Sequence, residues 1–202
     1  MKYVLIGNGI NIQFGGTAYS NYFILERIKS KAKIGGYAKL FDNSITGEDI
    51  INIFNGFVNI ANGIKTGKYV KLTDDIELMD AFNDFKKRYK NKIKYTYNIM
   101  LEDWILLVEA FFLENDDLSD NKQLSIQGFK IKILDSIYNE GKLQEIYKSM
   151  SKKVKDYFAD YDEIFTLNYD NNIEHLMGKN VFHLHGDFSV LADSENPNTV
   201  NG

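Results

Sequence analysis

The order of strand and helix patterns along the chain is the feature that most constrains its fold. Val4-Leu5-Ile6 is a short apolar run that ends at Gly7, as a buried parallel strand does. Between residues 47 and 158 the apolar side chains recur only at helical spacing. Strand patterns return at residues 163–167 and 181–185, with a short helix through about Met177 between them. We therefore predict an α/β fold in which a parallel sheet is interrupted by a large helical insertion.

Local patterns predict further elements in the first half of the chain. A helix is expected from Ala18 to about Ser30, after a glycine loop that begins at Gly7. Residues 46–49 (Thr-Gly-Glu-Asp) and 73–75 (Thr-Asp-Asp) are typical of helix N-caps followed by acidic first turns. The apolar residues of 69–72 predict a short strand.

The domain organisation follows from these patterns. Residues 1–191 are expected to form a single α/β domain, with the helical insertion at about 47–158. The tail at 192–202 is rich in Asn, Ser and Asp, and we expect it to be poorly ordered.

Composition excludes several classes of protein. The 202 residues include 28 acidic and 24 basic side chains, so the net charge of -4 creates no field that attracts nucleic acid. The absence of cysteine excludes disulfides and cysteine-ligated zinc, and it fits a reducing cytoplasm. No apolar run is long enough for a signal peptide or a membrane span, so no membrane partner is expected.

Three segments carry candidate site residues, and each stands where a parallel strand is predicted to end. The first is the glycine loop Gly7-Asn8-Gly9-Ile10-Asn11, followed by Gly15-Gly16. Glycines let the main chain approach a pyrophosphate closely, and a helix N-terminus offers unpaired N–H groups. The same pattern also fits a plain strand-to-helix turn.

The second segment is Thr166-Leu167-Asn168-Tyr169-Asp170. The Asn168 amide can orient a water or a ribose hydroxyl, and the Asp170 carboxylate can balance positive charge. Alternatively, Asp170 caps a helix that begins at Asn171.

The third segment is His183-Leu184-His185-Gly186-Asp187. On a strand, His183 and His185 project to the same face, where they suit acid–base chemistry. They also suit a metal site completed by His175 or Asp187, or a structural pair of hydrogen-bonded histidines. His185 lies nearer the strand end, so we expect it to be the functional histidine and His183 to be enclosed and supporting.

Together the three segments resemble the motifs of the sirtuin family. The first resembles its G-A-G-I-S loop, the second its T-Q-N-I-D element, and Leu184-His185-Gly186 its L-H-G. The Asn-Tyr-Asp variant and residues 15–19 resemble more closely the sirtuin-like domains of bacterial antiphage systems, and the pattern is also similar to the abortive-infection AbiH-like family. The resemblance covers about residues 1–30 and 163–188, and it implies a Rossmann-like, sirtuin-like sheet in a bacterial protein.

This resemblance implies NAD as the ligand and cleavage of its nicotinamide–ribose bond as the reaction. Asn168 would then position the water or the nicotinamide ribose, His185 would be the general base, and Asp170 would stabilise the oxocarbenium-like state. The nucleotide-binding residues would be Gly7, Asn8, Gly9, Ile10, Asn11, Thr17 and Gly186. The cysteine-ligated zinc module and the G-I-P-D-F-R segment of sirtuin deacetylases are absent from this sequence, so deacetylation is not expected.

Two other classes of function stay open. A nucleotide-sensing or interaction module without catalysis would use the helical middle for self-association or for a partner within a defence system. It would fit the short polar sequence after Asp187, since family members continue with at least one more strand and this chain is expected to be a fragment or an incomplete member. A metal-dependent hydrolase that uses His183 and His185 is the other alternative.

Overall fold

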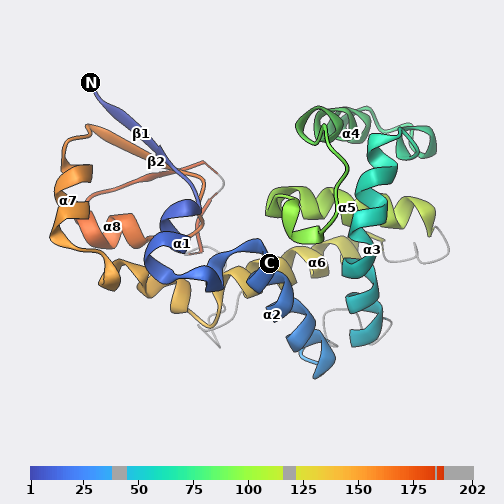
Figure 1. Cartoon of the computed structure of the whole chain (residues 1–202), viewed down its shortest axis with the longest axis horizontal. Coiled ribbons are helices and arrows are strands. Elements are labelled where there is room, and N and C mark those ends of the chain that lie inside the picture. The colour runs from blue at the N-terminus through green and yellow to red at the C-terminus, as the bar shows by residue number, and fades with distance from the viewer. Residues whose placement is uncertain (38–44, 116–121, 185, 189–202) are drawn as a thin grey trace. The chain divides into compact units, whose positions relative to one another are not determined.

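The strands and helices of the chain belong to two units that differ in architecture. The computed structural model describes residues 1–37, 45–115, 122–184 and 186–188, so His185 and the tail predicted at 192–202 lie outside the described residues. Unit 1 comprises Met1–Ile24 and Leu134–Gly202, and unit 2 comprises Leu25–Ile133. The boundaries fall within helices α2 (Asn21–Lys33) and α6 (Lys122–Tyr138) (Figure 1).

Unit 1 contains a parallel sheet of three strands. The strands are β1 (Tyr3–Ile6), β2 (Glu163–Thr166) and β3 (Phe182–His183), in the order β1-β2-β3. Tyr3 pairs with Glu163 and Ile6 with Thr166, while Thr166 pairs in turn with His183. The predicted parallel α/β arrangement is confirmed. The third strand is shorter than the predicted 181–185, although the Leu184 N–H still donates to the Thr166 carbonyl at 2.9 Å.

The helices of unit 1 pack on one face of this sheet (Figure 1). Inward-facing Ile6 and Ile164 are buried with Phe158 and Ile173, whereas Leu5 and Phe182 on the opposite face stay exposed. These helices are α1 (Gly9–Gly15), α7 (Lys152–Ala159) and α8 (Asn172–Met177), with the 3₁₀ segments η1 (Thr17–Tyr19) and η6 (Lys142–Ser149). The strand order across the sheet follows the sequence order, so both right-handed crossovers fall on the same face. This explains why the helices pack on one face only.

The beginning of the chain differs from the prediction in one respect. The glycine turn is only Gly7-Asn8, because α1 already begins at Gly9. The helix predicted at 18–30 begins instead at Asn21 and continues to Lys33. Gly15 is required by packing: a Cβ at this position would lie 2.6 Å from the Ile146 side chain and from the Tyr19 ring.

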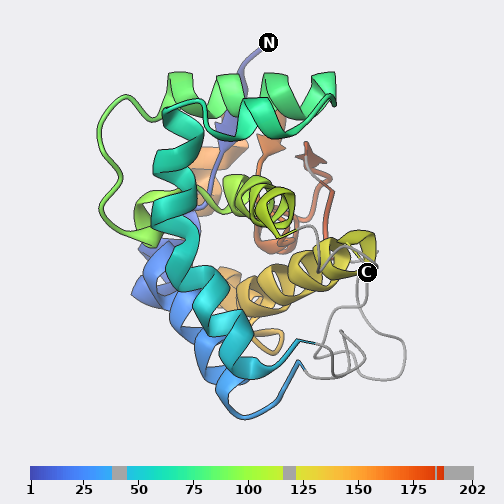
Figure 2. The ribbon, with the colours of Figure 1, turned by 90° about the vertical axis from the view of Figure 1, so that its right-hand side faces the viewer.

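Unit 2 is entirely helical in its described residues, as predicted for the middle of the chain. Its helices α3 (Gly47–Lys65), α4 (Ile76–Arg88) and α5 (Leu101–Glu114) are joined by η3 (Tyr69–Leu72) and η4 (Thr96–Asn98), and α3 runs beside α4 and α5 (Figure 2). An aromatic core of Phe54, Phe57, Trp104 and Phe129 fills this unit.

Helix caps in unit 2 confirm two predictions, while a predicted strand is wrong. Thr46 and Asp49 form a reciprocal capping box at the start of α3, and the Asp75 carboxylate accepts the first N–H groups of α4. The strand predicted at 69–72 is a 3₁₀ turn. The buried Tyr69 anchors that turn through a 2.7 Å hydrogen bond from its hydroxyl to Glu114.

None of the helices that the structure describes combines the length and the apolar character that a bilayer crossing requires.

Candidate functional site

The turns after β1 and β2 lie side by side at the carboxyl edge of the sheet. The Leu167 N–H donates to the Ile6 carbonyl at 2.9 Å, and the Asn168 side-chain amide donates to the Gly7 carbonyl at 3.4 Å. The Asn168 N–H donates to Thr166 Oγ1 at 3.0 Å, and its side chain is buried. The parallel register therefore brings the first and second candidate segments together, although about 160 residues separate them in the sequence.

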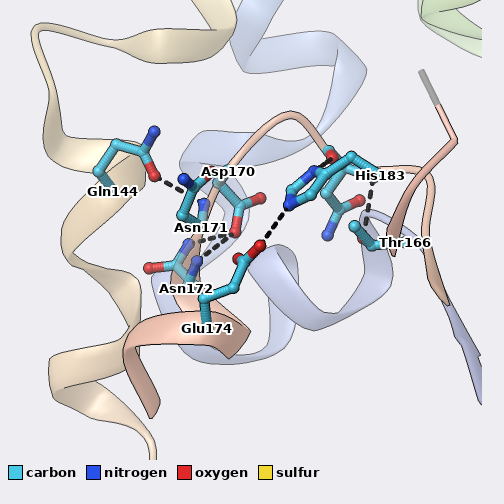
Figure 3. Close-up of polar contacts among 8 residues, drawn as sticks. Gln144, Thr166, Asp170, Asn171, Asn172, Glu174 and His183 are labelled. Carbon is cyan, nitrogen blue, oxygen red and sulfur yellow. Dashed lines mark hydrogen bonds and ion pairs between the residues drawn. The ribbon is translucent and has the colours of Figure 1, made fainter. Parts of the chain in front are cut away.

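Asp170 joins helix α1 to the start of helix α8. Its Oδ2 accepts a 2.6 Å hydrogen bond from the Asn11 side-chain amide. Its Oδ1 accepts from the Asn172 N–H at 3.1 Å and from the Asn172 side-chain amide at 2.6 Å (Figure 3). Asp170 is only 3% exposed, and its donors Asn11 and Asn172 are buried as well. Both carboxylate oxygens therefore accept their hydrogen bonds away from solvent. The N-cap residue of α8 is Asn171, so the helix begins one residue later than expected and Asp170 lies just before the cap, with its carboxylate accepting the N–H of the first helical residue, Asn172.

Asn11 presents an unsatisfied acceptor. It is 2% exposed, and its Oδ1 has no hydrogen-bond partner among the described residues. The Asp170 carboxylate can only accept, so it fixes the Asn11 amide with its nitrogen toward Asp170 and its oxygen away. Since an unpaired buried oxygen is costly, this atom is suited to accept a hydrogen bond from a ligand hydroxyl or from a water.

His183 has both ring nitrogens engaged. Nδ1 lies 2.9 Å from the Asn168 carbonyl oxygen, and Nε2 lies 2.8 Å from Glu174 Oε1 (Figure 3). No ring nitrogen is left to take a proton from a substrate. This geometry fits the supporting hydrogen bond to a neighbouring loop that we expected of His183. Sequence reasoning missed Glu174, although its place four residues after Asp170, on the first turn of α8, was a usable signal.

The other candidate residues are less connected. Thr17 is exposed in η1, where its carbonyl accepts the Ser20 N–H at 2.9 Å. Gly186 follows His185 with a φ of +80°, a left-handed conformation that favours glycine. The Phe188 N–H then donates to the Tyr169 carbonyl at 2.9 Å, which returns this segment to the turn after β2.

The described part of the chain does not supply a set of ligands for the metal-site alternative. No group of three or more His, Asp or Glu side chains within it could hold a metal ion. The His175 ring packs against Tyr147, with 5.1 Å between the ring centroids. Asp187 lies beyond His185, whose own position is not described.

A pocket of about 540 Å³ opens beside the glycine turn. It is lined by Val4, Leu5, Ile6, Gly7, Gly9, Ile10, Gln13 and Phe14, and by Lys153, Val154, Tyr157 and Phe158 of α7. A Cβ added at Gly7 or Gly9 would meet nothing within 4 Å, so the space in front of these residues is open. The volume is typical of small-molecule sites.

Comparisons with models of protein families, with curated proteins and with solved structures find no match.

Chemically, the edge of the sheet offers two side-chain amides beside a buried carboxylate. Asn11 and Asn168 can orient hydroxyl groups, while Asp170 places negative charge next to Asn11. Gly7 links this amide cluster to the pocket, because it both lines the pocket and accepts from Asn168. Such an arrangement suits a polar ligand with hydroxyl groups that extends from the pocket toward the turn after β2.

Proposed function

We propose that this chain binds NAD at the carboxyl edge of its sheet and cleaves the nicotinamide–ribose bond, as an NAD glycohydrolase of bacterial antiphage or abortive-infection defence in the cytoplasm. One observation carries the proposal. Asn11 and Asp170 come from two segments that resemble sirtuin motifs, and they meet in a buried 2.6 Å hydrogen bond. The Rossmann-like, sirtuin-like assignment of the fold belongs to the same proposal. It is supported by the site residues following parallel strands.

The glycine turn and its pocket would hold the nucleotide. Gly7 and Gly9 leave the main chain open to a pyrophosphate, and Lys153 in the pocket lining supplies a positive charge. The other nucleotide-binding candidates are Asn8 in the same turn, Ile10 and Asn11 in α1, Thr17 in η1 and Gly186 in the third segment. The Asn11 oxygen then accepts from a ribose hydroxyl.

Hydrolysis would proceed at C1′ of the nicotinamide ribose. Water adds to C1′ as the C–N bond breaks, the bonding electron pair passes to the pyridine nitrogen, and His185 accepts the proton from the water. Asn168 orients the water or the ribose. Positive charge develops on the sugar in such a reaction, and the Asp170 carboxylate stabilises it through the polar cluster.

The decisive experiment follows nicotinamide release from NAD. We expect the unmodified protein to release nicotinamide, and Asn168→Ala and His185→Ala each to reduce the rate at least about 100-fold. Asn55→Ala, on the exposed side of α3, is the matched control and should keep full activity. Equal rates in all four proteins would refute the assignment.

A second candidate, nucleotide binding without turnover, is favoured by the hydrogen bonds that Asp170 already accepts within the protein. Both of its oxygens are already held by N–H donors, as in a purely structural role. Calorimetry with ADP-ribose and NAD separates the two functions. Binding of both with no nicotinamide release would support a sensing module, whereas absence of binding at millimolar concentration would remove both functions.

A further inference from the structure

Glu174 and His183 form an enclosed pair next to the Asn168 turn. The His183 side chain is 7% exposed and the Glu174 side chain 23%, and Glu174 Oε1 lies 2.8 Å from His183 Nε2. The other Glu174 oxygen, Oε2, is buried and has no hydrogen-bond partner among the described residues. Among the described residues, His183 is therefore the hydrogen-bond partner that holds the Glu174 side chain in place.

The acceptors around the ring determine where its protons lie. A carbonyl oxygen can only accept, so His183 Nδ1 must donate its hydrogen to Asn168. A proton must also lie between Nε2 and Glu174, since two bare acceptors would repel each other. The Glu174 carboxyl group is therefore linked to the Asn168 carbonyl through hydrogen bonds at the two nitrogens of one ring.

This pair holds the main chain of Asn168 from one side. The His183 ring donates a hydrogen bond to the Asn168 carbonyl, while Thr166 Oγ1 accepts one from the Asn168 N–H at 3.0 Å. The Asn168 side chain is thereby directed toward the Gly7 carbonyl. Glu174 is not one of the residues that line the pocket.

We infer that Glu174 is a positioning residue: through its hydrogen bond to the His183 ring it sets the orientation of the Asn168 turn. Asn168 is a site residue only under the proposed function, so the inference rests on that proposal for its effect on turnover. The geometric part is independent of it. Without the carboxylate, His183 loses the hydrogen-bond partner that fixes its ring, and its hold on the Asn168 carbonyl weakens.

The test compares Glu174→Gln with the unmodified protein. Gln can still accept a hydrogen bond but carries no charge, so it separates charge from packing. Nitrogen-15 NMR of the histidine rings should show Nδ1 of His183 protonated in both proteins, and the Nε2 resonance should shift in Glu174→Gln because an amide replaces the carboxyl group as its partner. For NAD cleavage we expect kcat to fall about tenfold with little change in KM, because misorientation of a positioned group affects the reacting geometry more than binding.

Glu145→Gln is the matched control, since Glu145 is exposed and paired with Lys148 in η6. It should change neither the His183 spectrum nor kcat. Thermal melts confirm that each variant is folded, and Glu174→Asp should restore the Nε2 resonance in part. An unprotonated Nδ1 in the unmodified protein, or an unchanged Nε2 resonance in Glu174→Gln, overturns the inference.

The two proposals fail in different ways. If no protein releases nicotinamide, the proposed function is lost, and the Asn168 amide resonance then becomes the readout of positioning. A shift of that resonance in Glu174→Gln but not in Glu145→Gln supports the inference, and its absence overturns it.

Discussion

At the scale of single residues, the site depends on buried polar groups that satisfy one another across distant parts of the chain. Asp170 accepts one hydrogen bond from Asn11 and two from Asn172, and it is buried. A charged acceptor with several N–H donors is strongly stabilising, and its loss leaves those donors unpaired. Asp170 therefore contributes to the stability of unit 1 before it contributes to any reaction.

We predict that Asp170→Asn lowers the free energy of unfolding by about 2 kcal/mol, because the new amide directs N–H groups at the Asn11 or Asn172 donors. Urea denaturation followed by circular dichroism measures the change. Asp156→Asn, at an exposed position of α7, should change the stability little. Loss of turnover without loss of stability in Asp170→Asn would show that the carboxylate acts only chemically.

At the scale of elements, the sheet of unit 1 is packed on one face only. Alternation along each strand sends Ile6 and Ile164 into the core and Leu5 and Phe182 outward. All-parallel sheets are usually covered on both faces, and the apolar outer positions have the composition of a buried face. The strand order β1-β2-β3 accounts for this, since both crossovers return on the same side.

The two faces should respond differently to truncation. Ile164→Ala should lower the free energy of unfolding by about 3 kcal/mol, because it opens a cavity next to Phe158 and Ile173. Leu5→Ala should cost less than about 1 kcal/mol, since Leu5 is already 59% exposed while Ile164 is 1% exposed. Chemical denaturation of both variants provides the comparison. Equal costs would mean that the outer face is covered in solution.

At the scale of the whole molecule, the two units differ in what they contain, because the candidate site residues lie in unit 1 and the aromatic core of helices α3 and α5 lies in unit 2. The contacts among Gly7, Asn11, Asn168, Asp170 and His183 all lie in unit 1. Unit 2 instead encloses a titratable amine in its aromatic core. Lys132 is fully buried, with its ammonium nitrogen 4.6 Å from the centroid of the Phe129 ring and 5.2 Å from that of Tyr37.

This lysine should make stability depend on pH. Burial lowers the pKa of Lys132 from 10.5 to about 6, so at neutral pH the folded state holds it uncharged while the unfolded state is protonated. The unfolded state then binds more protons, and stability rises with pH between about 6 and 10.5, by at most about 1.4 kcal/mol per pH unit. Below pH 6 both states are protonated and the slope disappears.

Lys132→Met removes this dependence while keeping the length of the side chain. We expect the variant to be more stable at pH 7, with the difference from the unmodified protein shrinking as the pH rises toward 9. Urea denaturation at several pH values measures it. Lys130→Met, two residues away on α6, is the control. A constant difference between the Lys132 variant and the unmodified protein across this range would contradict the predicted pKa.

Local sequence patterns predicted many of the helices and strands, because these elements depend on interactions among residues close together in the sequence. Apolar spacing predicted the strands near Val4 and Ile164 and the helical middle, and Thr46 and Asp75 predicted helix starts. The same reasoning misplaced the beginning of the chain, since a helix of only seven residues from Gly9 has too little periodicity to be distinguished from a loop. It also predicted a strand at residues 69–72, where burial of Tyr69 and its bond to Glu114 favour a 3₁₀ turn.

The sequence by itself determined which elements form and which residues follow the strands, because periodicity, glycine turns and caps act over a few neighbouring residues. The tertiary structure alone decided how those residues are used. Asn11 meets Asp170 across 159 positions, Glu174 finds His183 across 9, and the sheet buries one apolar face while leaving the other exposed. These outcomes depend on strand order and on which donors and acceptors packing brings within hydrogen-bond distance, and no local pattern encodes either.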